Sequence, residues 1–171
     1  MALSTQEVEQ YHRDGYVCPV PVMPASEAAG LRRQLEAVEA RQGGKLEAAQ
    51  RSRAFLLFKW LDDLIRDPRV LDPVEQLIGP DILCWSTIFW IKDAGSKSFV
   101  SWHQDNTYWG LSSRNVVTAW FAISEASVDA GWRRRSCRGS EEFGVVELSV
   151  RLIPATREAR DFSALPFFQG G

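Results

Sequence analysis

The fold is decided by the stretch Ile82-Leu83-Cys84-Trp85-Ser86-Thr87-Ile88-Phe89-Trp90-Ile91-Lys92. This stretch is rich in β-branched and aromatic residues, which favour a strand. It follows directly on residues 68–78, where a proline opens a helical pattern of apolar residues that Gly79-Pro80 ends. The period of the chain therefore changes from that of a helix to that of a strand at this point. Helices first and strands afterwards predict an α+β protein.

The chain before this strand, residues 1–80, is expected to be mainly helical. One helix should occupy residues 5–13 and a second residues 24–43, because each has a start signal and ends near a glycine. Between these helices, residues 16–20 indicate a short strand. Residues 55–58 form an apolar run that we expect to be buried, as either strand or helix.

Residues 81–130 are expected to supply the first strands of a sheet, including one at 116–123. Residues 131–171 form a tail of different character, because its first part has neither helical nor strand period. Within the tail, only residues 146–154 indicate another strand. No low-complexity linker or internal repeat separates these parts, so we interpret residues 1–171 as a single domain.

Composition and charge exclude several classes of function. The net charge is −2 and no basic block of the kind that follows phosphates occurs, since the arginines within residues 133–138 fit a basic surface loop, so nucleic acid is not an expected partner. No apolar run approaches the roughly 20 residues that cross a bilayer, and no signal peptide is recognised, so no membrane association is expected. The cysteines Cys18, Cys84 and Cys137 are far apart and odd in number. They favour reduced thiols and a cytoplasmic protein.

A candidate metal site lies in Trp102-His103-Gln104-Asp105. A histidine and an aspartate two positions apart on an extended segment project from the same face, so His103 and Asp105 can hold one metal ion. A second histidine would complete the ligand set of non-heme Fe(II) oxygenases. The spacing alone also fits a structural hydrogen bond. The other histidine of the chain, His12, lies near the N-terminus, where an exposed or packing role is the simpler interpretation.

Several motifs, taken in order, resemble the phytanoyl-CoA dioxygenase family. The first is Tyr11-His12-Arg13-Asp14-Gly15-Tyr16-Val17, which resembles the N-terminal signature of that family. The others are Trp60-Leu61-Asp62-Asp63, Ile78-Gly79-Pro80-Asp81-Ile82, Ser101-Trp102-His103-Gln104-Asp105 and Thr118-Ala119-Trp120-Phe121-Ala122-Ile123. The resemblance covers roughly residues 5–130.

This resemblance implies N-terminal helices plus an incomplete double-stranded β-helix, a cupin-like jelly roll. It implies Fe(II) as the metal and 2-oxoglutarate as cosubstrate, with O2 and a small organic molecule as the other substrates. The implied reaction hydroxylates the small molecule while 2-oxoglutarate is oxidatively decarboxylated. His103 and Asp105 are then two of the three iron ligands. Trp120, Ile88 and Gln104 match family positions close to 2-oxoglutarate.

Beyond residue 130 the chain departs from the family pattern. The family places its second iron histidine there, followed by an arginine that binds 2-oxoglutarate. This chain has no histidine after His103, and Val145 stands near the place expected for the arginine. Residues 146–154 resemble the last strand of the family. The chain therefore resembles a truncated or internally deleted member, and we expect impaired activity.

The tail suggests a further hypothesis about the gene. Stepping back one base within residues 134–139 can restore Ala-Val-Val-Pro-Gly, which is close to the strand expected there, if the codons are GC-rich. The nucleotide sequence tests this directly, because the hypothesis fails if no shifted frame contains Val-Pro-Gly.

Three functions stay open on the sequence. The chain is an oxygenase whose site another chain or an alternative ligand completes, a non-catalytic remnant, or a small-ligand binding module of the same fold. Iron binding with succinate release separates the first from the other two.

Overall fold

The computed structural model describes residues 2–93, 111, 115–124 and 145–154. The helices are α1 (Thr5–Asp14), α2 (Ala25–Gln42), α3 (Ala48–Arg51), the 3-10 helix η1 (Ala54–Leu56), α4 (Lys59–Ile65) and α5 (Pro68–Ile78). The strands are β1 (Ile82–Lys92), β2 (Val117–Ala122) and β3 (Val145–Pro154). Helices precede strands, so the predicted α+β class is confirmed for this part of the chain. No helix in the described ranges combines the length and hydropathy that a bilayer crossing requires.

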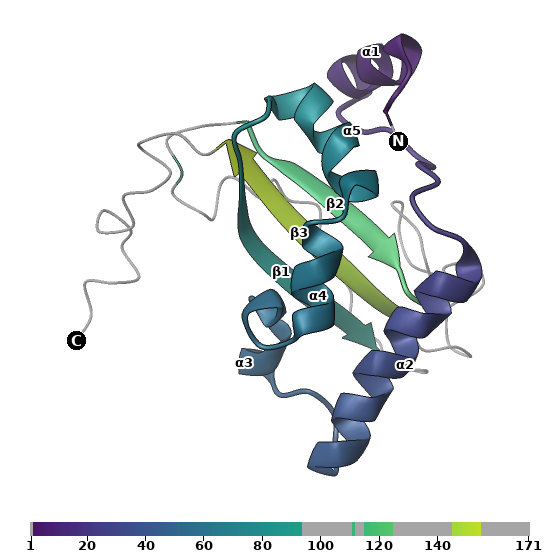
Figure 1. Ribbon diagram of the computed structural model, residues 1–171, viewed down its shortest axis with the longest axis vertical. Helices are drawn as coiled ribbons and strands as arrows, with labels where there is room; N and C mark the ends of the chain where they lie inside the picture. Colours follow the sequence, from purple (N-terminus) through teal and green to yellow (C-terminus); the bar gives the residue numbers. More distant parts are fainter. Residues whose placement is uncertain (1, 94–110, 112–114, 125–144, 155–171) are drawn as a thin grey trace.

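The three strands form one antiparallel sheet in the order β1-β3-β2 (Figure 1). The pairing of β1 with β3 runs from Ile82 opposite Pro154 to Lys92 opposite Val145. The strand expected at residues 146–154 is therefore present as β3, and it is central. Because β3 pairs with both earlier strands, the end of the described chain holds its first strands together.

One face of this sheet forms the core with the helices. Alternate strand residues are buried on this face, as the period of two requires. Figure 1 shows α4 and α5 in front of the sheet, and Leu61 of α4 and Leu35 of α2 are almost completely buried in the same apolar cluster. The buried apolar strand residues of this cluster are Phe89, Val117, Phe121, Val150 and Leu152.

Local signals in the sequence explain where the helices begin and end. Ser4 and Glu7 form a capping box at the start of α1, and Gly15 ends that helix in the left-handed conformation with φ of 78°. The α5 helix begins after Asp67, whose carboxylate accepts a hydrogen bond from the backbone N–H of Arg69. The helices predicted over residues 5–13 and 24–43 are confirmed with small changes in their ends.

The short strand predicted at residues 16–20 is wrong. The structure has no strand in this segment, which connects α1 to α2. Pro19 lies within it and has no backbone N–H to donate to a β-ladder. Hydrophobic and β-branched residues alone were therefore a poor guide here.

The prediction that residues 55–58 are buried is wrong for two of the four. Leu56 and Leu57 are 70% and 58% exposed. The run begins in the 3-10 helix η1, which turns Ala54 into the core and directs the two leucines outward. Phe55 and Phe58 are partly buried and pack against the core.

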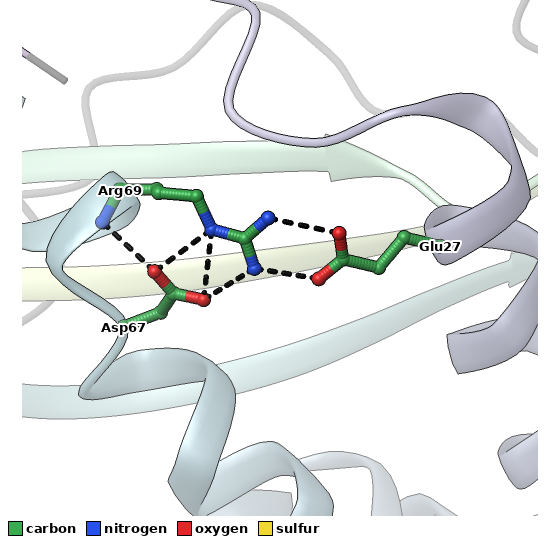
Figure 2. Close-up of polar contacts among 3 residues, drawn as sticks. All are labelled: Glu27, Asp67 and Arg69. Carbon is green, nitrogen blue, oxygen red and sulfur yellow. Dashed lines mark hydrogen bonds and ion pairs between the residues drawn. The ribbon is translucent and has the colours of Figure 1, made fainter.

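A cluster of three charged residues joins α2 to the start of α5 (Figure 2). The guanidinium of Arg69 donates to both carboxylate oxygens of Glu27, with N–O distances of 2.8 and 2.5 Å. The same guanidinium donates to Asp67, which caps α5. This arrangement fixes the first turn of α2 against α5 across 42 positions of sequence.

Candidate functional site

Three of the predicted site residues, His103, Gln104 and Asp105, lie outside the described residues. Their ligand and cosubstrate roles therefore stay predictions. The described strands on either side of them in the sequence are β1 and β2, which carry the other two predicted residues.

Ile88 and Trp120 are brought together by the sheet register. Ile88 of β1 pairs with Ser149 of β3, and Trp120 of β2 pairs with the same residue from the other side. The neighbouring pairs, such as Thr87 with Val150, belong to the buried face. Because side chains alternate across a strand, Ile88 and Trp120 lie on the opposite face, away from the helices. Trp120 is 37% exposed, so the described residues do not bury this face fully.

The segment 52–55 runs along the edge of β1 that does not pair with β3, beside Ile88. Ser52 forms an isolated antiparallel bridge with Ile88. The backbone N–H of Arg53 donates to the carbonyl oxygen of Thr87 at 2.7 Å, and that of Phe55 donates to the Thr87 hydroxyl at 3.2 Å. The edge of β1 next to the candidate site is thus covered by a fixed loop.

Arg53 is a candidate functional residue that the motifs did not indicate. Its backbone is left-handed, with φ of 53° and ψ of 34°, and its guanidinium carbon lies 5.9 Å from the centroid of the Trp85 ring. Trp85 itself sits where the register of β1 shifts, between Cys84 and Ser86. No sequence pattern marks Arg53, because its conformation arises from contacts with a strand more than 30 positions away.

The chemistry of the described cysteines excludes a ready thiolate at Cys84. Burial raises the pKa of the Cys84 thiol to about 12, so the group is protonated at neutral pH. Its sulfur contacts the carbonyl oxygen of Ser86 at 3.8 Å. Both described cysteines, Cys18 and Cys84, are free thiols, as the sequence predicted.

His12 does not take part in a metal site with the other described residues. It is exposed in the last turn of α1, where its ring packs edge-on against Tyr11 at 5.7 Å between centroids. Within the ranges that the structure describes, no group of three histidine, cysteine, aspartate or glutamate side chains is placed to hold a metal ion.

Comparison with protein families gives a match to the phytanoyl-CoA dioxygenase (PhyH) family over residues 11–132. The chain belongs to the phytanoyl-CoA dioxygenase family. The matched segment contains β1, β2 and all five of the predicted site residues. It ends where the tail of different character begins. None of the curated proteins matches the chain.

Solved structures show the same fold. One is a non-heme monooxygenase described as a ThoJ–Ni complex, with 22% identity and a TM-score of 0.70, covering 86% of this chain and 76% of that one. Another is CytC3 with Fe(II) and alpha-ketoglutarate, with 19% identity and a TM-score of 0.65, covering 90% and 78%. This family member thus shares its fold with a non-heme monooxygenase and with CytC3.

Proposed function

We propose that this protein is an Fe(II)- and 2-oxoglutarate-dependent dioxygenase that hydroxylates a small organic substrate. The observation that carries the proposal is the pairing of Ile88 and Trp120 with one position of β3, on the sheet face away from the core. Both residues match family positions close to 2-oxoglutarate, and they flank the same residue of β3. The family match over residues 11–132 supports the same assignment.

The donor set suits the proposed metal. His103 offers an imidazole nitrogen and Asp105 a carboxylate oxygen, the ligand types of non-heme Fe(II) oxygenase sites. CytC3, a structure of the same fold, is described with Fe(II) and alpha-ketoglutarate, another name for 2-oxoglutarate. When bound, iron would allow O2 to act as the oxidant, with one oxygen atom entering the hydroxylated substrate and the other entering succinate as 2-oxoglutarate is oxidised and loses carbon dioxide.

The described residues would shape the space beside the metal. Ile88 and Trp120 form two apolar walls on either side of the β3 position that both oppose. Apolar walls exclude water and favour an organic substrate over bulk solvent. Gln104, between the two ligands in sequence, is proposed to contact the cosubstrate.

The three described strands are proposed to be part of an incomplete double-stranded β-helix. A complete site needs a third ligand, and the only histidine besides His103 is His12. We propose that another side chain or another protein chain supplies this ligand, and that the affinity for iron is weaker than in a site with two histidines. Weaker affinity is expected to reduce turnover at limiting iron.

Metal binding and product release test the proposal in two measurements. The full chain is titrated with Fe(II) under anaerobic conditions, and succinate formation from 2-oxoglutarate is then measured in air. His103→Ala and Asp105→Ala should abolish both iron binding and succinate formation. His12→Ala is the matched control, because it removes the other histidine of the chain and should leave both unchanged.

The other two functions predict different results in the same assay. A chain that binds iron through His103 but forms no succinate is a non-catalytic remnant. A chain that binds small apolar molecules without iron, unaffected by His103→Ala, is a ligand-binding module. Either result would contradict the proposed activity.

A further inference from the structure

Arg53 has a backbone conformation that residues with a Cβ atom rarely adopt. Among the described residues, no other non-glycine residue has a positive φ. Left-handed conformations are disfavoured for such residues, and they persist only where neighbouring groups hold them. They also occur preferentially at binding sites.

The contacts that hold Arg53 place it next to the candidate site. Its N–H donates to the carbonyl oxygen of Thr87, one residue before Ile88. The preceding residue, Ser52, pairs directly with Ile88. Thr87 is completely buried, and its hydroxyl also accepts from Phe55, so the loop is fixed on both sides of Arg53.

The guanidinium of Arg53 lies over an aromatic ring and donates no hydrogen bond to another described residue. Its central carbon lies 5.9 Å from the Trp85 ring centroid, within the range of a cation–π contact. The side chain is exposed, and no carboxylate of the described residues forms an ion pair with it. A planar guanidinium held in this way matches the two oxygens of a carboxylate.

Two exposed leucines follow Arg53 on the same loop. Leu56 and Leu57 are 70% and 58% exposed, although adjacent exposed leucines are unfavourable in water. A cation on the same loop as two exposed apolar side chains suits a ligand that has a carboxylate at one end and a hydrocarbon part at the other.

We propose that Arg53 anchors a carboxylate at the β1 edge of the site and so determines which molecules bind there. The location of the site rests on the proposed function. The carboxylate belongs to 2-oxoglutarate, whose expected arginine partner is missing near Val145, or to the organic substrate, whose hydrocarbon part contacts Leu56 and Leu57. The chemistry of recognition is the same in both cases.

The first arm of the test concerns the cosubstrate. The full chain with Fe(II) is titrated anaerobically with 2-oxoglutarate and with 2-oxopentanoate, which lacks the second carboxylate. Arg53→Gln should weaken 2-oxoglutarate binding by about 10- to 100-fold, the loss expected for a charge-assisted hydrogen bond. It should leave 2-oxopentanoate binding unchanged. Arg33→Gln, which removes an exposed cation from α2, is the matched control and should change neither affinity.

The second arm concerns the substrate and needs no iron. Binding of hexanoate is compared with that of hexanamide, which has the same chain length and no charge. If the anchored carboxylate is that of the substrate, Arg53→Gln should weaken hexanoate binding by a similar factor and leave hexanamide unchanged. A second variant, Arg53→Gly, fits the left-handed backbone and should reproduce each result without a loss of folding.

The outcomes distinguish the two sources of the carboxylate, and they also test the Arg53 anchor separately from the proposed oxygenase activity. An Arg53-dependent loss in the first arm identifies the 2-oxoglutarate carboxylate, and one in the second arm identifies the substrate carboxylate. Equal affinities for wild type and both Arg53 variants in both arms would overturn the anchor, even if iron and 2-oxoglutarate bind normally. Arg53-dependent hexanoate binding without any iron or 2-oxoglutarate binding would sustain the anchor and contradict the oxygenase.

Discussion

At the scale of single residues, Thr87 joins the loop before α4 to the sheet. Its side chain is completely buried, and its hydroxyl accepts the backbone N–H of Phe55 at 3.2 Å. Its carbonyl oxygen accepts the N–H of Arg53. One strand residue therefore satisfies two loop donors that would otherwise lack partners.

Replacing Thr87 by valine keeps the shape of the side chain and removes the acceptor for Phe55. We expect the free energy of unfolding to fall by about 1–3 kcal/mol, the usual cost of a buried unsatisfied donor. The specific measurement is amide hydrogen exchange at Phe55, which should accelerate in Thr87→Val. Thr87→Ser keeps the hydroxyl and should leave this amide protected; equal exchange in both variants would show that the hydroxyl does not hold the loop.

Leu35 and Leu57 test the assignment of core and surface. Leu35 is 1% exposed, so Leu35→Ala should lower the free energy of unfolding by about 2–5 kcal/mol. Leu57 is 58% exposed, and Leu57→Ala should change the free energy of unfolding by no more than about 0.5 kcal/mol. Urea unfolding of both variants measures the difference, and similar losses would show that Leu57 is buried in solution.

At the scale of elements, the Glu27–Arg69–Asp67 cluster makes the contact between α2 and α5 dependent on pH. Hydrogen bonds from the Arg69 guanidinium lower the pKa of Glu27 and that of Asp67. A lowered pKa in the folded state stabilises the fold above the unfolded pKa, for which the ordinary values are 4.5 and 3.8. This contribution is lost as the pH falls through the lower, folded values.

Removing Arg69 should therefore lower the stability of the fold at neutral pH and not in acid. We expect Arg69→Gln to lower the urea midpoint at pH 7, and the difference from wild type to shrink progressively below about pH 4 as the carboxylates become protonated. It should also shrink in 1 M salt, because the groups are partly exposed. Arg33→Gln on α2 provides the control, and a difference that persists at pH 3 would contradict an ionic origin.

The sequence predicted those elements whose signals are local. The α5 helix has its proline start and glycine end within 12 residues, and β1 begins and ends at the residues expected from its composition. The strand prediction at residues 16–20 was wrong because a favourable composition cannot replace a strand to pair with. The predicted burial of Leu56 and Leu57 was wrong because the hydrophobicity of a residue does not show which way a loop directs its side chain.

Features that depend on distant contacts could not be predicted from the sequence. The central place of β3 follows from pairing with two strands that precede it by tens of residues. The same register brings Ile88 and Trp120 to one position of β3, whereas the motifs assigned each only by family resemblance. The Arg53 conformation and the bond from Arg69 to Glu27 likewise arise from contacts across the fold.

At the scale of the whole molecule, the two faces of the sheet differ in what they contribute: one forms the core and the other is the proposed site. The face toward the helices carries the apolar core, which includes Phe89, Phe121 and Val150. The other face carries Ile88 and Trp120 and is the proposed site. The described core contains no group of side chains that could hold a metal ion. Because the core packs on the face opposite the proposed site, we expect the fold not to require iron, unlike small domains that are unfolded without their metal.

This separation predicts the effect of metal removal on stability. Fe(II) that binds only the folded chain stabilises it by mass action, about 2.7 kcal/mol at 100 times the dissociation constant. For a chain of this size that corresponds to a rise in Tm on the order of 5–10 °C. A chelator should abolish this rise and return Tm to the value of His103→Ala, while the far-ultraviolet circular dichroism at 20 °C stays unchanged. Because the core packs on the opposite face from the proposed site, loss of secondary structure on chelation would mean that the metal supports the fold directly. A rise in Tm with Fe(II) that persists in His103→Ala would mean that the metal binds elsewhere.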